Sequence, residues 1–421
     1  MRRWGFLGLV AALAAAALPA TARSGEAGFG AQVAQAADTG ESAAGFAAWL
    51  DGVRAEAVAS GLPAAAVDRA LAPVTWRPVV VERDRNQPEF VRTFWDYVGR
   101  AVTDERVATG RERMAALSGT LARIEARYGV PGHYLVAIWG LESAFGRIQG
   151  DHPVIEALAT RAYTRRETGA FRGQLLDALA IVAEGRVPES RLVGSWAGAM
   201  GQPQFMPSAY RAFAEDFDGT GFADIWASET DALASIANYL SANDWAPDER
   251  WGREVRVPAG FDWSLADLDI RRPLADWAAM GIRTAAGGPL PVVAGMEAAL
   301  ALPAGHQGPA YLVYGNFDSI LSYNRALFYG LAIGLMADRL VERGAVPDAP
   351  PSADRPLTTD DIAEIQRLLA TLGYEPGPAD GIPGTRTKDA IRAFQQAAAL
   401  PADGHHSPQL LDRLRTAAGR G

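Results

Sequence analysis

The fold of this chain depends on one apolar helix, which we infer from residues 133–146, HYLVAIWGLESAFG. Pro131 stands where a helix accepts proline, in its first turn, and Gly146 stands where a helix ends. Apolar side chains three, four and seven positions before Glu142, and three positions after it, share its side of the helix. The spacing therefore predicts a core helix that carries one carboxyl group on its apolar face.

A carboxyl group in that position is expected to bind its proton tightly. Its charged form loses water among aromatic and aliphatic side chains, so its pKa rises toward the range in which it can donate a proton. The alternative is a structural ion pair between Glu142 and a neighbouring arginine such as Arg147. Position alone does not choose between these two interpretations.

Helical patterns fill most of the chain before residue 243. The clearest of them comes early, where apolar side chains recur on one helical face. Its members are Phe90, Phe94, Tyr97, Val98 and Ala101. This helical spacing predicts a mainly α-helical domain.

The residue pattern changes between Trp251 and Gly315, where it predicts short strands bounded by turns instead of helices. The three expected strands are Glu254–Pro258, Glu297–Pro303 and Pro309–Tyr314. Helical periodicity then returns over residues 324–343. We therefore predict a mainly α (α+β) domain at residues 40–343 that includes a small β subdomain.

A second, smaller domain follows at residues 358–416. The linker before it, residues 344–357, is rich in proline and has no apolar period. Within the domain, Pro-Ala-Asp-Gly occurs at residues 378–381 and again at 401–404, each time before an apolar helical pattern. We expect a three-helix domain with a weak internal duplication.

The N-terminal residues 1–22 have the pattern of a cleaved export signal, with two arginines, a short apolar run and small residues at the end. The 421-residue chain contains no cysteine, which excludes disulfides and a lipid-modified cysteine. Removing the signal lowers the formal net charge from −9 to −11. This acidity disfavours nucleic acid and anionic membranes as partners. The expected location of the soluble mature protein is periplasmic or secreted, without a membrane anchor.

A second unusual stretch is residues 195–210, SWAGAMGQPQFMPSAY, in which amides and hydroxyls alternate with aromatic and small residues. Aromatic faces stack on sugar rings, and Gln and Ser donate fixed hydrogen bonds to sugar substituents. A carbohydrate cleft is one interpretation, and a glycine-rich turn with core aromatics is the other. Ser195 is not a nucleophile elbow, because GSWAG lacks the G-x-S-x-G spacing.

Together, the two stretches resemble the lytic murein transglycosylase B family. WGLESAFG at residues 139–146 matches the family pattern around its catalytic acid, and residues 195–210 match its downstream signature. The resemblance continues through ANYL at 237–240 and YNRALFY at 323–329. It implies a lysozyme-like helical fold in which Glu142 is the catalytic acid and base.

The same resemblance implies a set of substrate-binding residues. They are Ser195, which would lie hydrogen-bonded near Glu142, and Gln204, Tyr239, Tyr323 and Tyr329. For each tyrosine, core packing is the alternative.

The implied reaction cleaves the β-1,4 bond between N-acetylmuramic acid and N-acetylglucosamine in peptidoglycan glycan strands and leaves 1,6-anhydromuramoyl ends. It requires no cofactor. Glycoside hydrolases generally use two carboxyl groups, about 5 to 10 Å apart. Asp151 and Glu156 are nearest to Glu142 in sequence, but neither lies in a motif that directs it to the same bond. A muramidase that uses water and a non-catalytic peptidoglycan-binding protein remain the alternatives.

Residues 216–224, DFDGTGFAD, follow the spacing of an EF-hand calcium loop. Position twelve holds Ala227 instead of the usual Glu, and the family resemblance implies a modified loop whose last acidic ligand comes later. The candidate ligands are Asp216, Asp218, Thr220, Asp224 and Asp231. A structural calcium and a turn held by Asp side chains alone are both open.

The C-terminal domain resembles the small helical peptidoglycan-binding domain of wall enzymes. The resemblance is carried by residues 365–374, by Asp380 and Gly381, and by Ala393-Phe-Gln395. Attached through the linker, such a domain would raise the local concentration of peptidoglycan around the catalytic domain.

Overall fold

The computed structural model describes residues 43–85, 92–164, 169–347 and 356–419. The predicted export signal, Phe90 and most of the linker lie outside these residues. The chain divides into two compact units, and the first contains the described residues before Asn86 together with Trp139–Asn238. The second unit contains the described residues from 92 to 138 and those from 239 onward.

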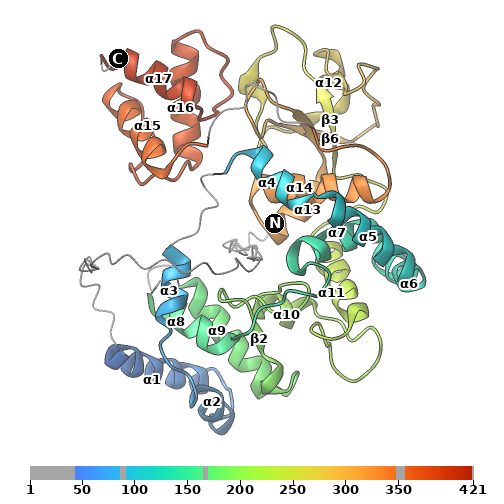
Figure 1. The fold of residues 1–421 in the computed structure, drawn as a ribbon, viewed down its shortest axis with the longest axis vertical. Helices are drawn as coiled ribbons and strands as arrows, with labels where there is room; N and C mark the ends of the chain where they lie inside the picture. The colour runs from blue at the N-terminus through green and yellow to red at the C-terminus, as the bar shows by residue number, and fades with distance from the viewer. Residues whose placement is uncertain (1–42, 86–91, 165–168, 348–355, 420–421) are drawn as a thin grey trace, which may run out of the picture. The chain divides into compact units, whose positions relative to one another are not determined.

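Helices dominate both units (Figure 1). The first unit contains α1 (Ala43–Ala59), α2 (Ala64–Leu71), α3 (Pro78–Arg85), α8 (Val154–Thr164), α9 (Ala170–Ala183), α10 (Pro207–Phe213) and a short ribbon of β1 (His152–Pro153) with β2 (Val193–Gly194). Two helices cross from one unit into the other, α7 (Gly132–Ser143) and α11 (Glu229–Ala242). The helices of the second unit are α4 (Phe94–Ala101), α5 (Asp104–Ala116), α6 (Ser118–Tyr128), α12 (Leu274–Ala279), α13 (Gly315–Tyr323), α14 (Leu327–Leu340), α15 (Thr359–Thr371), α16 (Thr385–Ala397) and α17 (Pro408–Ala417).

The early amphipathic pattern forms helix α4, as predicted. Phe94, Tyr97, Val98 and Ala101 are all buried on it. The hydroxyl of Thr93 caps the helix by accepting a hydrogen bond from the N–H of Asp96 at 3.2 Å.

A five-stranded antiparallel sheet forms the centre of what we call the sheet subdomain, residues 251–314. Its strand order is β4-β6-β7-β3-β5, with β3 at Gly252–Arg256, β6 at Glu297–Ala301 and β7 at Ala310–Val313. These three strands lie where strands were predicted, although β3 begins and ends two residues earlier than expected. The edge strands β4 (Arg272–Pro273) and β5 (Arg283–Thr284) were not predicted, because two residues carry no period.

Helix α14 lies within the predicted residues 324–343, but more of its residues are buried than the sequence pattern suggested. The sequence suggested one apolar stripe, whereas eleven residues of the helix are buried. Gly334 lies so close to the indole ring of Trp251 that a side chain there would collide with it. This helix is therefore part of the core and is packed on several sides.

No single helix among the described residues is long and apolar enough to cross a membrane. Only α13 and α14 taken together, with a bend of 115° between them, meet that length and composition.

The C-terminal domain is the predicted set of three helices, α15, α16 and α17. Its core is built from aliphatic side chains and one phenylalanine, including Ile365, Leu368, Ile391, Phe394 and Leu411. A reciprocal capping box between Thr358 and Asp361 starts α15. The fold class inferred from the sequence is thus confirmed, mainly α with a small sheet.

Candidate active site

Glu142 lies in the last turn of α7 and is the one residue of this helix that is not buried. Leu135, Ile138 and Trp139 are fully buried, and Phe145 is 4% exposed. The sequence predicted an apolar stripe beside Glu142, but α7 is buried all round. Glu142 is therefore the most exposed residue of this helix.

The backbone turns sharply after Glu142. Ala144, Phe145 and Gly146 all have positive φ, at 49°, 60° and 80°. The hydroxyl of Ser143 accepts a hydrogen bond from the N–H of Gly146 at 3.0 Å. The ring of Phe145 folds back so tightly that a Cβ on Gly140 would lie 2.8 Å from it. Ala144 and Phe145 pay a free-energy cost for this left-handed conformation, whereas Gly146 does not, so the surrounding packing must hold the turn in place.

Two amide side chains, the buried Gln202 and the half-buried Gln149, connect this turn to the loop of residues 195–205. The indole N–H of Trp139 donates to Oε1 of Gln202 at 2.8 Å, and Nε2 of Gln202 donates to the carbonyl of Trp226 at 3.2 Å. Gln149 donates to the carbonyls of Gly146 and Trp226 at 2.9 and 3.0 Å. These bonds cross-link three segments that are far apart in the sequence, and they rigidify the end of α7.

Gln204, a predicted substrate-binding residue, belongs to the same network. It is 7% exposed and has a φ of 51°. Its Nε2 donates to the carbonyls of Gln149 and Gly201 at 3.1 and 2.8 Å. The amide nitrogen of Gln204 thus helps to hold the loop in shape.

Ser195 lies at the start of the loop, directly after β2. Its N–H donates to the carbonyl of Ala199 at 2.8 Å, and its hydroxyl oxygen accepts from the N–H of Ala199 at 3.1 Å. The turn between them includes Gly198 at a φ of 88°. Because its oxygen acts as an acceptor there, the hydroxyl proton of Ser195 can be donated to another group.

Arg161 of α8 supports this loop from inside the first unit. Its guanidinium lies 3.8 Å from the ring centre of Phe171 and 5.0 Å from that of Trp196. Its Nη1 donates to the carbonyl of Ala197 at 3.4 Å. Arg161 is 5% exposed, and aromatic faces and the loop backbone are among the groups that contact its charge.

The two carboxyl groups nearest to Glu142 in sequence are engaged elsewhere. Oε1 of Glu156 accepts from the N–H and the hydroxyl of Thr75 at 3.1 and 2.6 Å, and its Oε2 lies 3.5 Å from Arg77. Asp151 is exposed and lies 3.8 Å from His152. Neither group is arranged as a partner for Glu142.

The predicted tyrosines belong to the second unit. The rings of Tyr239 and Tyr323 meet edge to face at 4.9 Å, and the hydroxyl of Tyr239 donates to the carbonyl of Ser322 at 2.7 Å. Burial raises the pKa of Tyr239, so this hydroxyl stays protonated. Tyr329 is 1% exposed on α14, which is the burial of a core residue.

The predicted calcium loop brings three of its five candidate ligands together. Oxygens of Asp216, Asp218 and Asp231 lie within 4.8 Å of one another. Asp224 instead accepts hydrogen bonds from the N–H groups of Trp226 and Ala227, at 3.2 and 3.0 Å.

The backbone organises these carboxylates. The N–H of Thr220, the other candidate ligand, donates to Asp216 at 2.8 Å. Asp231 is fully buried, and it accepts from the N–H groups of Phe217, Asp218 and Asp224 at 2.8, 3.1 and 2.9 Å. Three carboxylate groups held this close suit a calcium ion, which prefers oxygen ligands and offsets their mutual repulsion.

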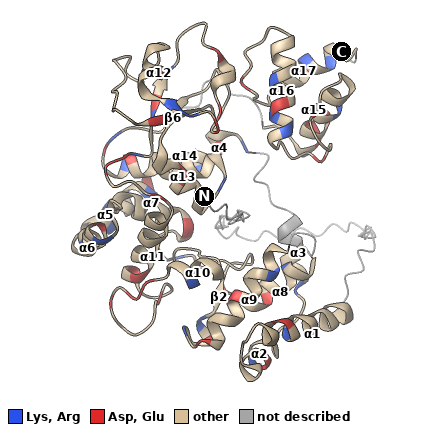
Figure 2. Ribbon diagram, turned by 180° about the vertical axis from the view of Figure 1, so that it is seen from behind, with Lys and Arg blue, Asp and Glu red and all other residues tan. Residues whose placement is uncertain are grey.

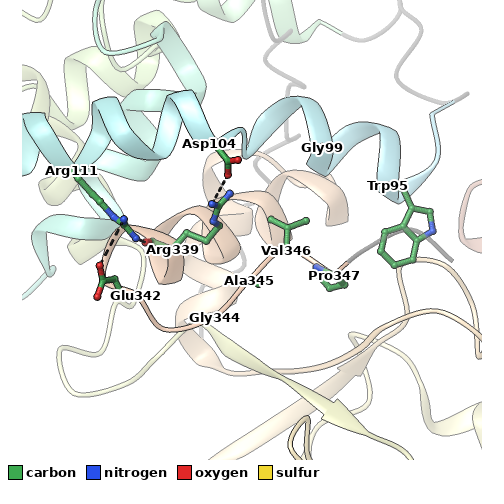
Figure 3. Close-up of a pocket in the computed structure, with 10 residues that line it drawn as sticks. All are labelled: Trp95, Gly99, Asp104, Arg111, Arg339, Glu342, Gly344, Ala345, Val346 and Pro347. Atoms are coloured by element: carbon green, nitrogen blue, oxygen red, sulfur yellow. Dashed lines mark hydrogen bonds and ion pairs between the residues drawn. The ribbon is translucent and has the colours of Figure 1, made fainter.

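A hollow of about 600 Å³ lies elsewhere, in the second unit (Figure 3). Two ion pairs form part of its wall, Arg339 with Asp104 at 2.7 Å and Arg111 with Glu342 at 3.8 Å. None of the predicted site residues lines it.

The catalytic part of the chain matches a known family. Residues 45–338 match the family of the transglycosylase SLT domain. The chain belongs to this family. A peptidoglycan-binding domain matches residues 358–414, which agrees with the resemblance inferred for the C-terminal domain.

Similar proteins with known names or structures agree with this assignment. Membrane-bound lytic murein transglycosylase B of Escherichia coli K12 is 31% identical, over 56% of this chain and 64% of its own length. SltB3 from Pseudomonas aeruginosa, solved in complex with NAG-anhNAM-pentapeptide, is 50% identical, with a TM-score of 0.83 over 88% of this chain and 99% of that chain. The Escherichia coli lytic transglycosylase Slt35, solved in complex with calcium, is 26% identical, with a TM-score of 0.60 over 70% and 93% of the two chains.

Reasoning from the sequence missed the role of Gln202 and Gln149 in this SLT domain. The sequence alone does not distinguish a glutamine that holds a loop by hydrogen bonds from a glutamine in a solvent-exposed turn. The available signal was the sequence Gln202-Pro-Gln204, where two amides stand next to small and aromatic residues.

Proposed function

We propose that this protein is a lytic transglycosylase that cleaves the β-1,4 bond between N-acetylmuramic acid and N-acetylglucosamine in peptidoglycan glycan strands. One observation carries the proposal. Glu142 is the one residue of α7 that is not buried, and hydrogen bonds of the buried Gln202 and the half-buried Gln149 hold the end of that helix. Family membership and the names of the relatives support the same activity.

In the proposed reaction one carboxyl group acts twice. Protonated Glu142 donates its proton to the glycosidic oxygen, the bond from that oxygen to C1 of the muramoyl residue breaks, and an oxocarbenium-like state forms. The Glu142 carboxylate then takes the proton of the C6 hydroxyl, and O6 bonds to C1. The product is a 1,6-anhydro end, no water is consumed, and the acid is restored. The engagement of Glu156 with Thr75 and Arg77 supports a mechanism without a second carboxyl group.

We further propose that Ser195, Gln204, Tyr239 and Tyr323 contact the glycan. Ser195 has a hydroxyl proton to donate, and the aromatic pair of Tyr239 with Tyr323 offers ring surface for a sugar. The burial of Tyr329 supports packing as its main role.

We propose that the protein acts in the periplasm or the surrounding medium, and the predicted export signal supports this location. Peptidoglycan lies there, so the substrate and the proposed location agree. The C-terminal domain would bind the same polymer.

We also propose that Asp216, Asp218 and Asp231 hold a structural calcium ion. The ion would stabilise the loop before α11, and no step of the reaction passes through it. Calorimetric titration of the chelator-treated protein with calcium chloride tests this. Asp218→Asn should weaken binding, and Asp224→Asn, which alters a carboxylate outside the cluster, should leave it nearly unchanged. Absence of binding at millimolar calcium would refute the proposal.

The reaction is tested by mass spectrometry of the products released from purified sacculi. The wild-type protein and Asp151→Asn, a control at the neighbouring exposed carboxyl, should release anhydro-muropeptides, and Glu142→Gln should release none. Reducing ends would indicate a muramidase. No release by any of the three proteins would leave peptidoglycan binding as the function.

A further inference from the structure

The C-terminal domain contains two copies of one turn, and a buried glutamine holds each copy. In the first copy, Nε2 of Gln366 donates to Oδ1 of Asp380 at 3.1 Å, and Oε1 of Gln366 accepts from the N–H of Gly381 at 2.9 Å. The N–H of Ile382 donates to the same Oδ1 of Asp380 at 2.9 Å. Asp380 is exposed in this turn, and Ile382 is 47% exposed.

The second copy has the same bonds. Nε2 of Gln395 donates to Oδ1 of Asp403 at 2.8 Å, and its Oε1 accepts from the N–H of Gly404 at 2.8 Å. The N–H of His405 donates to Oδ1 of Asp403 at 2.9 Å. The internal duplication inferred from the sequence is therefore a duplication of structure.

The two copies differ in what covers them. Asp403 is 6% exposed, because its other oxygen meets the sheet subdomain. Oδ2 of Asp403 lies 2.7 Å from Nδ1 of His306 and accepts from the N–H of His306 at 2.9 Å. Both residues belong to the second unit, as does all of the C-terminal domain.

The loop that carries His306 is shaped to receive this turn. Gly305 has a φ of 69°, and a Cβ built on it would lie 2.9 Å from the ring of His405 and 3.0 Å from Oδ2 of Asp403. A side chain larger than hydrogen would collide with the turn. The backbone at residue 305 and the second turn therefore fit each other closely.

A second contact lies beside the first, at Asp267 of the sheet subdomain. Oδ2 of Asp267 lies 2.7 Å from Arg392 and 3.1 Å from Lys388, both on α16, and Arg392 also donates to the carbonyl of Ala266 at 2.7 Å. Figure 2 marks basic and acidic positions along the ribbon of α16. The side chains of Arg392 and Asp267 are only 13% and 17% exposed.

We propose that the C-terminal domain is docked on the sheet subdomain, and that its second Asp–Gly turn has diverged from the first to form the contact. A buried carboxylate is costly unless it is paired, and Asp403 has its partner His306 on the other domain. Peptidoglycan bound by the C-terminal domain is then held at a fixed position relative to the sheet subdomain. This inference does not depend on the proposed reaction.

Distance measurement between two spin labels tests the docking, and the absence of native cysteine simplifies the labelling. The label sites are Ala275→Cys on α12 and Gln396→Cys on α16, both exposed. In the mature full-length chain we expect one narrow distance distribution. If the residues 344–357 were the only connection, the distances would spread on the order of 20 Å.

Substitutions on the sheet subdomain then probe the contact without touching the core of the C-terminal domain. His306→Ala combined with Asp267→Asn should broaden the distribution. Asp380→Asn, which alters the equivalent carboxylate of the first turn, is the matched control and should leave it narrow. A broad distribution in the otherwise unchanged chain would overturn the proposal. So would a distribution that stays narrow in the double variant, or one that Asp380→Asn broadens equally.

Discussion

Trp139 donates a 2.8 Å hydrogen bond from its indole nitrogen to Oε1 of Gln202, and this bond ties the helix of Glu142 to the loop of Ser195. Trp139 is fully buried and Gln202 is 3% exposed, so neither group can exchange the bond for one with water. A hydrogen bond of this kind contributes more to positioning than an exposed one, because its loss leaves a buried donor without a partner.

We predict that Gln202→Met lowers the free energy of unfolding by about 1 to 3 kcal/mol, since it leaves the indole N–H of Trp139 unsatisfied. It should also lower kcat more than it raises KM, because the end of α7 loses its position. Urea unfolding and turnover on sacculi measure the two effects. The control is Gln396→Met on the exposed face of α16, where we expect little change. Equal effects of the two substitutions would count against the network.

Gly146 follows the turn after Glu142 and is expected to tolerate no side chain. Its φ is 80°, and a Cβ would lie 2.5 Å from Oε1 of Gln202. Gly146→Ala should destabilise the protein by at least about 1 to 2 kcal/mol from the backbone conformation alone. Gly52→Ala is the matched control, because Gly52 lies inside helix α1 with open space around it. This change should stabilise by about 0.5 to 1 kcal/mol, so thermal unfolding should shift in opposite directions.

Arg161 is predicted to need its planar guanidinium. Lysine keeps the charge but loses the flat group that lies near the rings of Phe171 and Trp196, and it presents a more strongly hydrated group to a buried site. Arg161→Lys should therefore lower stability by about 1 to 2 kcal/mol. Arg127→Lys, at an exposed arginine 5.1 Å from the ring of Tyr128, should change it by less than about 0.5 kcal/mol. Chemical denaturation measures the free energy of unfolding of both variants. An unchanged value for Arg161→Lys would show that the charge is needed and the planar group is not.

The fold was largely predictable because its elements carry periodic patterns. The face of α4 and the three longer strands were predicted from spacing alone. The surroundings of α7 and α14 were not, since a helix packed on several sides has apolar residues without a period, and a stripe is only part of that pattern. Glu142 could still be found, because it is the single charged residue in an apolar helix.

The contacts of the candidate site and of the C-terminal domain were less predictable, because they join residues far apart in sequence. Gln202 meets Trp139 across 63 positions, and Asp403 meets His306 across 97. The sequence indicated that Pro-Ala-Asp-Gly is repeated. It contained no sign that one copy is buried against another domain and the other is exposed.

The docking contact should depend on pH through Asp267. Burial alone would raise the pKa of this carboxyl, but the N–H of Asp269 and the cations Lys388 and Arg392 lower it to about 2. A carboxyl whose pKa is lower in the folded protein than in the unfolded chain stabilises the fold above about pH 4, and the effect is lost as the pH falls toward 2. One pKa unit corresponds to about 1.4 kcal/mol, so Asp267 contributes on the order of 2 kcal/mol near neutral pH.

The variant Asp267→Asn isolates this contribution. At pH 7 it should unfold more easily than the wild-type protein by roughly that amount, and the difference between the two should shrink as the pH is lowered from 4 to about 2.5. Urea unfolding at several pH values measures it, followed by a probe within the C-terminal domain, such as fluorescence from a label on α16. A difference that stays constant down to the lowest pH would mean that the charge of Asp267 does not stabilise the contact. A difference that grows toward low pH would have the wrong sign for a carboxyl whose pKa is lowered by neighbouring cations.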